Sequence, residues 1–455
     1  MRIDEAIKAG GQFWVPEDEN HKFQGTLNIS DGGEVILELT HEHSGLDSPF
    51  QDVNRIGGRV DGFGYVTLEN CWVMRSGFNN SGLGNTEVWV DAAICSIALE
   101  ADEDLLISSA TFSLEGLDEW MRGRAIHPKM VGVGSLNVEF KVKEPIKFEL
   151  QNGWGVEIFF PYTYETKGRG FSVKQNSYIK VISPTPVAID SYKSMLHNVA
   201  RFFSFANGTI CCIKDVVFRS KETVRTDSKG ESNEIPMPYF YRSLPFLRFD
   251  EVTPDPLFYF SDIADFLPDL FNNWNSICTK YKPAMWLYIS CLSNRYINHD
   301  AKFLAIMQAT ENMLEFEPGE FGIEESEYEE LVSGLISECP DEHIEWLGKV
   351  LKYANKPSLR RKLKNLLSPF HEIFGNKKQR LELVALAKDT RDYLTHYDQR
   401  LSDYIAKGSA LYKLKFQIEK AFEFKLMLLI GMNPKKIVSI VKRNNRILER
   451  LRPSN

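Results

Sequence analysis

Short apolar stretches that partly alternate with polar residues fill the chain up to about residue 185. They are rich in β-branched and aromatic residues, and turn-forming Gly, Asn, Asp and Pro separate them, as in Ser30-Asp31-Gly32-Gly33. A period of two bounded by such turns is typical of strands rather than helices. We therefore predict an antiparallel β-sandwich or barrel-like domain over residues 1–185. The expected strands cover 25–30, 33–40, 86–100, 135–142, 155–162 and 177–183, with one helix at 113–121.

The pattern becomes mixed over residues 186–254, which we predict to be a connecting segment. A helical period covers 190–206, a strand-like run covers 209–218, and the polar stretch 220–238 is expected to be a loop or hinge.

From about residue 255 onward the apolar residues recur at helical spacing. This predicts an all-α bundle over residues 255–455. The acidic run 315–342 interrupts that bundle and is expected to be a solvated insertion. The expected helices cover 260–278, 301–316, 341–355, 358–374, 378–406, 410–430 and 434–451.

Composition limits the class of protein. A chain of 455 residues, of which 43% are apolar and 12% aromatic, predicts two or three packed domains. The N-terminus lacks the apolar core of a signal peptide, and no apolar run approaches the roughly 20 residues of a membrane span. Seven scattered cysteines without a CxxC pair indicate reduced core thiols. We expect a cytoplasmic protein with no membrane partner.

Charge is distributed unevenly along the chain. Residues 351–455 carry 24 Lys and Arg against nine Asp and Glu, a net charge of +15, whereas residues 1–350 carry 30 against 53, a net charge of −23. A basic C-terminal quarter favours a polyanionic partner at that end. The alternative is that the two parts neutralise each other at an internal interface.

One stretch of the helical half, residues 388–398 (KDTRDYLTHYD), combines an arginine, an acid and a histidine. On a wheel at about 100° per residue, Arg391 and His396 lie about 140° apart and, with Asp392 and Thr395, fall outside an apolar stripe. That stripe comprises Leu383, Leu386, Ala387, Thr390, Tyr393, Leu394, Tyr397, Leu401 and Tyr404. These polar residues therefore line a cleft, meet a partner copy of the same helix, or form a solvated helix face.

The same residues suit the cleavage of RNA without a metal. A histidine can exchange a proton with a ribose 2′-OH or a leaving 5′-oxygen. An arginine can hold the scissile phosphate and offset its developing charge. Asp392 can orient either group, and two such sets across a two-fold axis would supply both an acid and a base. We set aside a second Arg-x4-His, Arg122 to His127, because it lacks helical context.

Residues 391–396 (RDYLTH) resemble the Arg-polar-x3-His signature of HEPN ribonucleases. Together with 301–316, they resemble the ApeA-like HEPN branch, and residues 11–39 and 111–121 resemble the ApeA N-terminal β-rich domain. The resemblance implies a bacterial anti-phage abortive-infection protein whose HEPN domain dimerises and cuts RNA, with catalytic Arg391, Asp392 and His396. It implies tRNA as one candidate substrate and a phage-encoded trigger. The chain departs from the family in having Asp392 where Asn is common and Asp398 where some HEPN toxins have Tyr.

Other motifs carry less chemistry. His41-Glu42-His43 has the spacing of two metal ligands on one strand face, but no further ligand cluster accompanies it, so we expect neither metal nor cofactor. Glu311 is a candidate supporting acid by analogy with other HEPN helices, but we leave it outside the predicted site because glutamates are common on helix surfaces. Basic stretches at 360–364, 377–380 and 442–446 are either an RNA-binding surface or solvated faces. The alternative to a ribonuclease is a non-catalytic RNA-binding or scaffolding protein.

Overall fold

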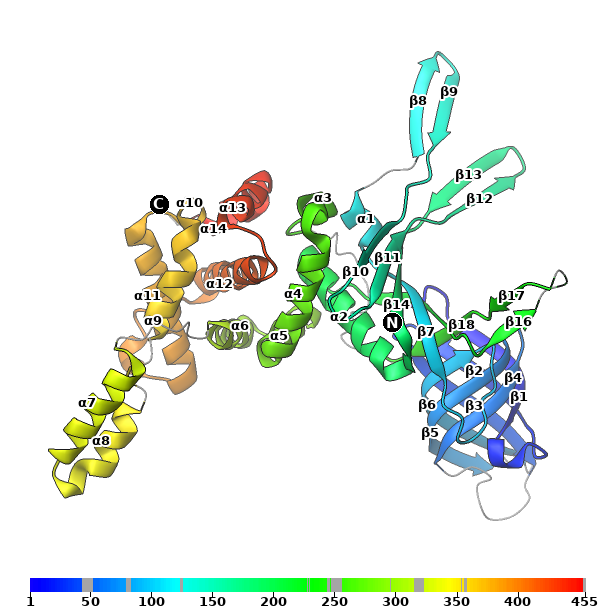
Figure 1. Ribbon diagram of the computed structural model, residues 1–455, viewed down its shortest axis with the longest axis horizontal. Helices are drawn as coiled ribbons and strands as arrows, with labels where there is room; N and C mark the ends of the chain where they lie inside the picture. The colour runs from blue at the N-terminus through cyan, green and yellow to red at the C-terminus, as the bar shows by residue number, and fades with distance from the viewer. Residues whose placement is uncertain are drawn as a thin grey trace. The chain divides into compact units, whose positions relative to one another are not determined.

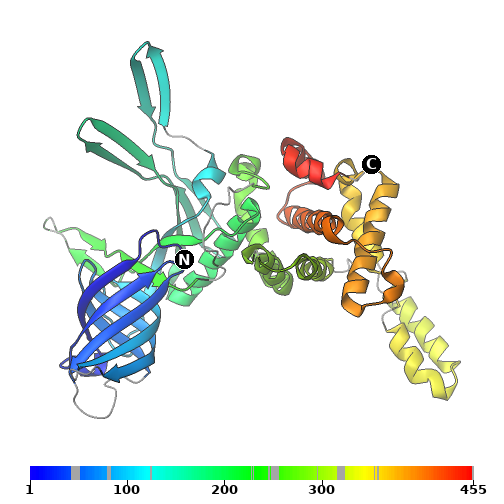
Figure 2. The ribbon, with the colours of Figure 1, turned by 180° about the vertical axis from the view of Figure 1, so that it is seen from behind.

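The computed structural model describes residues 1–42, 52–78, 83–122, 126–226, 228, 230–243, 246, 256–294, 296–314, 323–352, 354–355 and 358–452. The chain divides into two compact units, Met1–Asn272 and Asn273–Asn455 (Figures 1 and 2). The first unit is rich in strands and the second is helical. This confirms the predicted fold class.

Six antiparallel strands close into a barrel at the start of the chain. Their order is β6-β3-β2-β1-β4-β5, and β5 pairs back onto β6. The strands are β1 (Ile7–Trp14), β2 (Phe23–Ser30), β3 (Glu34–Glu42), β4 (Val53–Val60), β5 (Gly64–Phe78) and β6 (Leu83–Cys95). Closure removes the free edges that an open sheet would expose.

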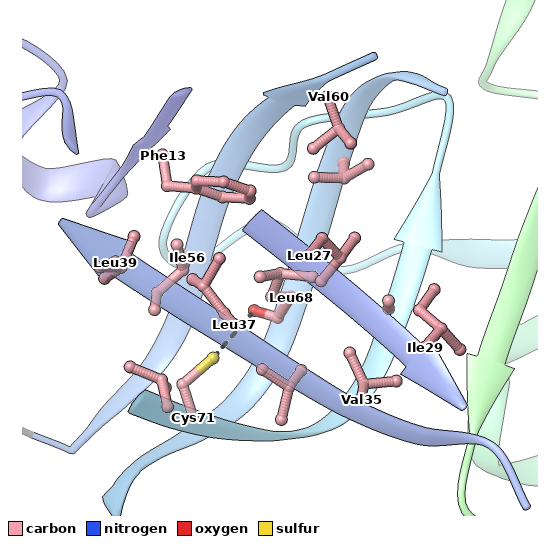
Figure 3. Close-up of a cluster of buried hydrophobic side chains, with 14 of the residues drawn as sticks. Phe13, Leu27, Ile29, Val35, Leu37, Leu39, Ile56, Val60, Leu68 and Cys71 are labelled. Atoms are coloured by element: carbon pink, nitrogen blue, oxygen red, sulfur yellow. Dashed lines mark hydrogen bonds between the residues drawn. The ribbon is translucent and has the colours of Figure 1, made fainter. Parts of the chain in front are cut away.

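The barrel interior is filled by alternate side chains of these strands (Figure 3). Phe13 on β1 packs directly over Gly58 on β4, where an added Cβ would lie 2.6 Å from the Phe13 ring. At Gly11 an added Cβ would lie 2.5 Å from the Arg59 carbonyl oxygen. The sequence pattern misses β1 and β4 because glycine weakens a strand signal, yet here glycine permits close backbone approach.

The sheet continues beyond the barrel. β18 pairs with β6 through residues 239–241 and with β15 through residues 237–238, and the order then runs β15-β7-β14-β11-β10. These strands are β7 (Leu106–Leu114), β10 (Ile146–Glu149), β11 (Gly155–Phe159), β14 (Tyr178–Ala188), β15 (Ile213–Arg219) and β18 (Met237–Tyr241). Helix α2 (Ile189–Asn207) packs on β7 and β14, as the helical period at 190–206 predicts.

Three two-stranded ribbons stand apart from the main sheet. They are β8 (Ile126–Gly132) with β9 (Ser135–Phe140), β12 (Tyr162–Lys167) with β13 (Gly170–Gln175), and β16 (Val224–Thr226) with β17 (Ser232–Glu234). The last ribbon shows that the loop predicted at 220–238 is wrong in part. The helix predicted at 113–121 is shorter than expected, because β7 extends to Leu114 and α1 covers only Leu117–Met121.

The predicted connecting segment 186–254 contains described elements of the first unit. Its helix α2 and strands β15 and β18 belong to the same compact unit as the barrel. The functional boundaries proposed at residues 185 and 254 stay predictions.

The helical unit contains most of the predicted helices, several of them interrupted. Pro369 lies in a 3-10 turn that separates α9 from α10, and Asn444 separates α13 from α14. The sequence pattern misses α5. The helices from residue 260 on are α3 (Phe260–Ile263), α4 (Leu267–Lys280), α5 (Lys282–Ser293), α6 (His299–Met313), α7 (Glu325–Ser337), α8 (Ile344–Leu351), α9 (Leu359–Leu367), α10 (His371–Phe374), α11 (Lys377–His396), α12 (Gly408–Leu429), α13 (Pro434–Arg443) and α14 (Asn445–Leu451).

All seven cysteines carry free thiols, six of them buried, as their scattered spacing predicts. Within the described ranges, none of the helices has the length and apolar character that crossing a membrane requires.

Candidate active site

Helix α11 carries the predicted motif, and specific residues define both of its ends. The Asn376 side chain accepts a hydrogen bond from the Gln379 backbone N–H, and the Gln379 side chain accepts one from the Asn376 N–H, each at 3.0 Å. This reciprocal pair satisfies N–H groups that have no partner within the helix. At the other end, Tyr397 adopts a left-handed conformation with φ of 52°. His396 is therefore the last helical residue, and its side chain is exposed.

The helix predicted at 378–406 is thus wrong beyond His396. The part of the predicted apolar stripe that follows His396 is wrong as well. Tyr397 and Tyr404 are 69% and 68% exposed. The inner part holds, since Ala387 and Thr390 are buried. The chain after the helix folds back on α11, where the Ala406 N–H donates a hydrogen bond to the Thr390 hydroxyl at 3.0 Å. A wheel extended past residue 396 cannot anticipate this reversal.

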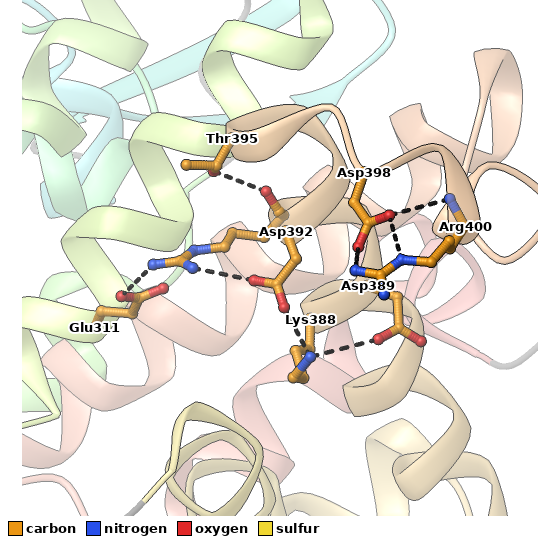
Figure 4. Close-up of polar contacts among 8 residues, drawn as sticks. Glu311, Lys388, Asp389, Asp392, Thr395, Asp398 and Arg400 are labelled. Atoms are coloured by element: carbon orange, nitrogen blue, oxygen red, sulfur yellow. Dashed lines mark hydrogen bonds and ion pairs between the residues drawn. The ribbon is translucent and has the colours of Figure 1, made fainter. Parts of the chain in front are cut away.

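Arg391 is held from two sides by carboxylates. Its Nη2 donates to Glu311 Oε2 on α6 at 3.1 Å, and its Nη1 donates to Asp392 Oδ1 at 3.0 Å. Figure 4 shows these contacts. The three side chains are 24–31% exposed, so the guanidinium is fixed but still reachable from solvent. Such an arrangement can present an arginine to an anion in a defined orientation.

Asp392 contacts two cations at once. In addition to Arg391, its Oδ2 accepts a hydrogen bond from Lys388 Nζ at 2.7 Å. Partial burial acts to raise the pKa of Asp392, but the hydrogen bonds from Lys388 and Arg391 outweigh it and lower that pKa. The carboxylate is therefore ionised and offsets the positive charge of Arg391 and Lys388.

Glu311 retains one oxygen for a further contact. Its Oε2 binds Arg391, whereas Oε1 is buried and is among the described side-chain atoms that have no hydrogen-bond partner. A buried acceptor without a partner is costly unless something supplies a donor. Among the described contacts, Glu311 Oε2 is thus the oxygen that holds Arg391, and Oε1 is an acceptor without a donor.

His396 lies about 1.4 helical turns beyond Arg391 and remains open to solvent. Near it, Asp398 has a lowered pKa, mainly through the hydrogen bonds from Arg400 and in smaller part through the charge of His396. Arg391, Asp392 and Glu311 thus form one contact network, and His396 lies outside these contacts at the end of the same helix.

Comparison with known proteins identifies two regions. A family model described as ApeA N-terminal domain 1 matches residues 8–274, more than half of the chain. A second model, described as Apea-like HEPN, matches residues 304–436. The chain belongs to the ApeA-like HEPN family. No curated protein and no solved structure matches this ApeA-like chain.

The HEPN match contains all of the candidate residues. It spans Glu311 on α6 and Arg391, Asp392 and His396 on α11. Lys388 is missing from the predicted site, although its position four residues before Asp392 is a signal for a helical ion pair. Glu311 lies 80 positions from Arg391, so only the fold brings the two together.

The other candidate motifs do not form sites in the described residues. Arg122 ends α1 and His127 belongs to β8, so the second Arg-x4-His does not share a helix. His41 and Glu42 end β3, while their side chains and all of His43 lie outside the described residues.

Proposed function

We propose that this ApeA-like protein is an anti-phage abortive-infection endoribonuclease that cuts RNA without a metal or other cofactor. Arg391, Asp392 and His396 are its proposed active-site residues, acting in a dimeric HEPN site. The main support is that one HEPN helix carries both a carboxylate-held arginine and, at its end, an exposed histidine.

The proposed reaction is an internal transesterification. A neutral His396 side chain takes the proton from a ribose 2′-OH, whose oxygen attacks the neighbouring phosphorus. The bond from phosphorus to the 5′-oxygen breaks, and a protonated His396 side chain of the second copy supplies the proton to that oxygen. Arg391 stabilises the charge on the phosphoryl oxygens. The products are a 2′,3′-cyclic phosphate and a 5′-hydroxyl.

The remaining parts of the proposal concern partners. The net charge of +15 over residues 351–455 favours an RNA substrate, and looped RNA such as tRNA offers accessible bases. The domain at 1–185 would sense a phage-encoded trigger, 186–254 would connect it, and 255–455 would carry the ribonuclease. The protein would act in the cytoplasm as a homodimer or higher even oligomer.

The direct test is RNA cleavage by the purified full chain. We expect cleavage to continue in EDTA, to leave the cyclic phosphate, and to fall at least about 10²-fold in Arg391→Ala and His396→Ala. His371→Ala is the matched control, since it removes another exposed histidine of the same unit, outside α11. Inhibition by EDTA, or full activity of His396→Ala, would show that the mechanism is wrong.

The second candidate function is RNA binding or scaffolding without cleavage. The pairing of Arg391 with two carboxylates is the observation that favours it, because a neutralised guanidinium attracts phosphate less strongly. RNA that is bound but recovered intact would support this alternative.

A further inference from the structure

Helices α7 and α8 form an antiparallel pair in which no residue is buried. The Tyr328 hydroxyl donates to the Leu351 carbonyl at 2.6 Å, and a Cβ at Gly348 would lie 4.0 Å from Ile336, so these residues mark the packing face. We call residues 323–352, which contain this pair, the α7–α8 arm. Two helices of 13 and 8 residues enclose too little apolar surface to form an independent core.

The arm presents large apolar side chains to solvent. Trp346 is 64% exposed and Val350 49%, and Leu331 and Leu335 are 45% and 44% exposed. Each pair is spaced by four residues, so Leu331 and Leu335 lie along one side of α7, and Trp346 and Val350 lie along one side of α8. Contiguous exposed apolar side chains of this kind mark interaction surfaces.

The negative charge of the arm favours a partner with a basic surface. The arm carries nine Asp and Glu against two Lys, a net charge of −7, whereas residues 358–452 carry 22 Lys and Arg against nine acids, a net charge of +13. On α9, Arg360, Arg361 and Lys364 are all exposed. In a dimer, the other copy of the chain therefore offers a basic helical surface that complements the acidic arm.

The place of the arm in the chain connects it with the candidate site. It follows α6, which carries Glu311, and precedes α9, and both helices pack on α11. In a two-fold dimer the contact between an arm and the other copy occurs twice. Each contact therefore needs to bury only about 800 Å² of total surface to reach a standard interface of ~1,600 Å².

We propose that the α7–α8 arm is a dimerisation arm, which docks its Leu331, Leu335, Trp346 and Val350 face on the basic helical surface of a second copy. This inference rests on the proposed dimeric site and names the surface that holds it together. The acidic residues of the arm select the basic partner, and the apolar side chains of the arm pack on the aliphatic stems of Arg360, Arg361 and Lys364.

The test compares two double substitutions on α7 in the full chain. Leu331→Glu with Leu335→Glu adds two charges to the apolar face, while Ser333→Glu with Ser337→Glu adds two charges at exposed positions on the other side of the helix. In sedimentation velocity over a micromolar concentration series, the first variant should raise the dimer dissociation constant at least about tenfold. The matched control should leave it within about twofold, and circular dichroism verifies that both variants are folded.

A charge exchange tests the receptor surface. Glu327→Lys with Glu330→Lys, and separately Arg360→Glu with Arg361→Glu, should each weaken association, and combining all four should restore it. A chain that is monomeric throughout the series, or equal association of the two α7 variants, would overturn the proposal. RNA cleavage by the same samples is measured independently of association. If the arm does not mediate dimerisation, the test of the proposed function by His396→Ala therefore remains valid.

Discussion

At the scale of single residues, Asp392 is better suited to hold Arg391 than to touch the phosphate. Its two oxygens are occupied by Lys388 at 2.7 Å and Arg391 at 3.0 Å. An ionised carboxylate at the scissile phosphate would repel it, whereas one behind the guanidinium fixes its orientation. Arg391 and His396 remain the residues with the proposed chemical roles.

Asp392→Asn should therefore retain cleavage within about tenfold of the unmodified chain, because an amide oxygen still accepts a hydrogen bond from Arg391. Asp392→Ala should lose more, since among the described residues Arg391 then keeps only the side chain of Glu311 as a partner. Single-turnover cleavage of one RNA by the two variants measures this. Equal loss in both would indicate that the charge of Asp392 itself takes part in the reaction.

At the scale of elements, the end of α11 decides where His396 stands. Tyr397 pays the steric cost of a left-handed conformation, with φ of 52°, although its side chain is 69% exposed. Glycine adopts this conformation without that cost and is the usual residue at such helix ends.

Tyr397→Gly should consequently raise the free energy of unfolding by up to about 1 kcal/mol. Urea unfolding followed by circular dichroism measures the change. Tyr404→Gly is the control, since Tyr404 is similarly exposed but is not among the described residues with positive φ. A destabilised Tyr397→Gly variant would mean that contacts of the Tyr397 ring, such as that with Tyr393, outweigh backbone strain.

A buried charged group links α12 with α5. Glu423 Oε1 accepts a hydrogen bond from the Tyr288 hydroxyl at 3.0 Å, and Oε2 accepts one from Lys420 Nζ at 2.6 Å. Burial raises the pKa of Glu423 to about 7, against the opposing effect of Lys420. Because the folded carboxyl then binds its proton more tightly than the unfolded one, this contribution to stability is full below pH ~4.5 and is lost as pH rises toward 7.

Glu423→Gln should remove that pH dependence, since an amide does not ionise in this range. We expect the loss of unfolding free energy between pH 5 and pH 7.5 to be smaller in the variant by more than about 1 kcal/mol. Urea unfolding of both proteins at the two pH values gives the difference, in which other titrating groups cancel. An unchanged difference would show that Glu423 stays ionised throughout.

Element types were predictable from the sequence where the apolar period was long, as in α2 and α12, but their interruptions were less so. Thr390 illustrates the reason. Its hydroxyl accepts a hydrogen bond from the Ala406 N–H of the chain that folds back after α11, whereas the sequence pattern predicts that the helix continues to residue 406. Glu311 illustrates the same limit for the site, since its contact with Arg391 joins residues 80 positions apart. Local periodicity carries no information about such contacts.

At the scale of the whole molecule, the β-rich and helical parts could be anticipated, but the sequence left open whether the strands form a sandwich or a closed barrel. Gly58 and Gly11 weaken the strand pattern of β4 and β1, and the same glycines allow Phe13 and the Arg59 backbone to approach closely. Closure depends on that approach and on the pairing of β5 with β6. A residue that looks like a strand breaker in sequence is here a condition of the fold.

The number of copies needed for one cleavage site is also a property of the whole molecule. If each site needs the His396 side chains of two copies as base and acid, a dimer with one His396→Ala subunit is inactive. Co-refolding unmodified chain with an equal amount of His396→Ala at constant total protein should then leave about a quarter of the activity, because random pairing makes only about a quarter of the dimers fully unmodified.

Sites that function within single copies would instead retain about half of the activity under the same random pairing. Mixing the unmodified chain with an equal amount of His371→Ala serves as the control. That variant lacks an exposed histidine outside α11, so the mixture should keep the full cleavage activity. Cleavage is followed over several mixing ratios, because a two-copy site gives a quadratic dependence on the unmodified fraction and a one-copy site a linear one. A linear dependence would contradict the proposal that two copies share one site, but it would leave the proposed role of His396 standing.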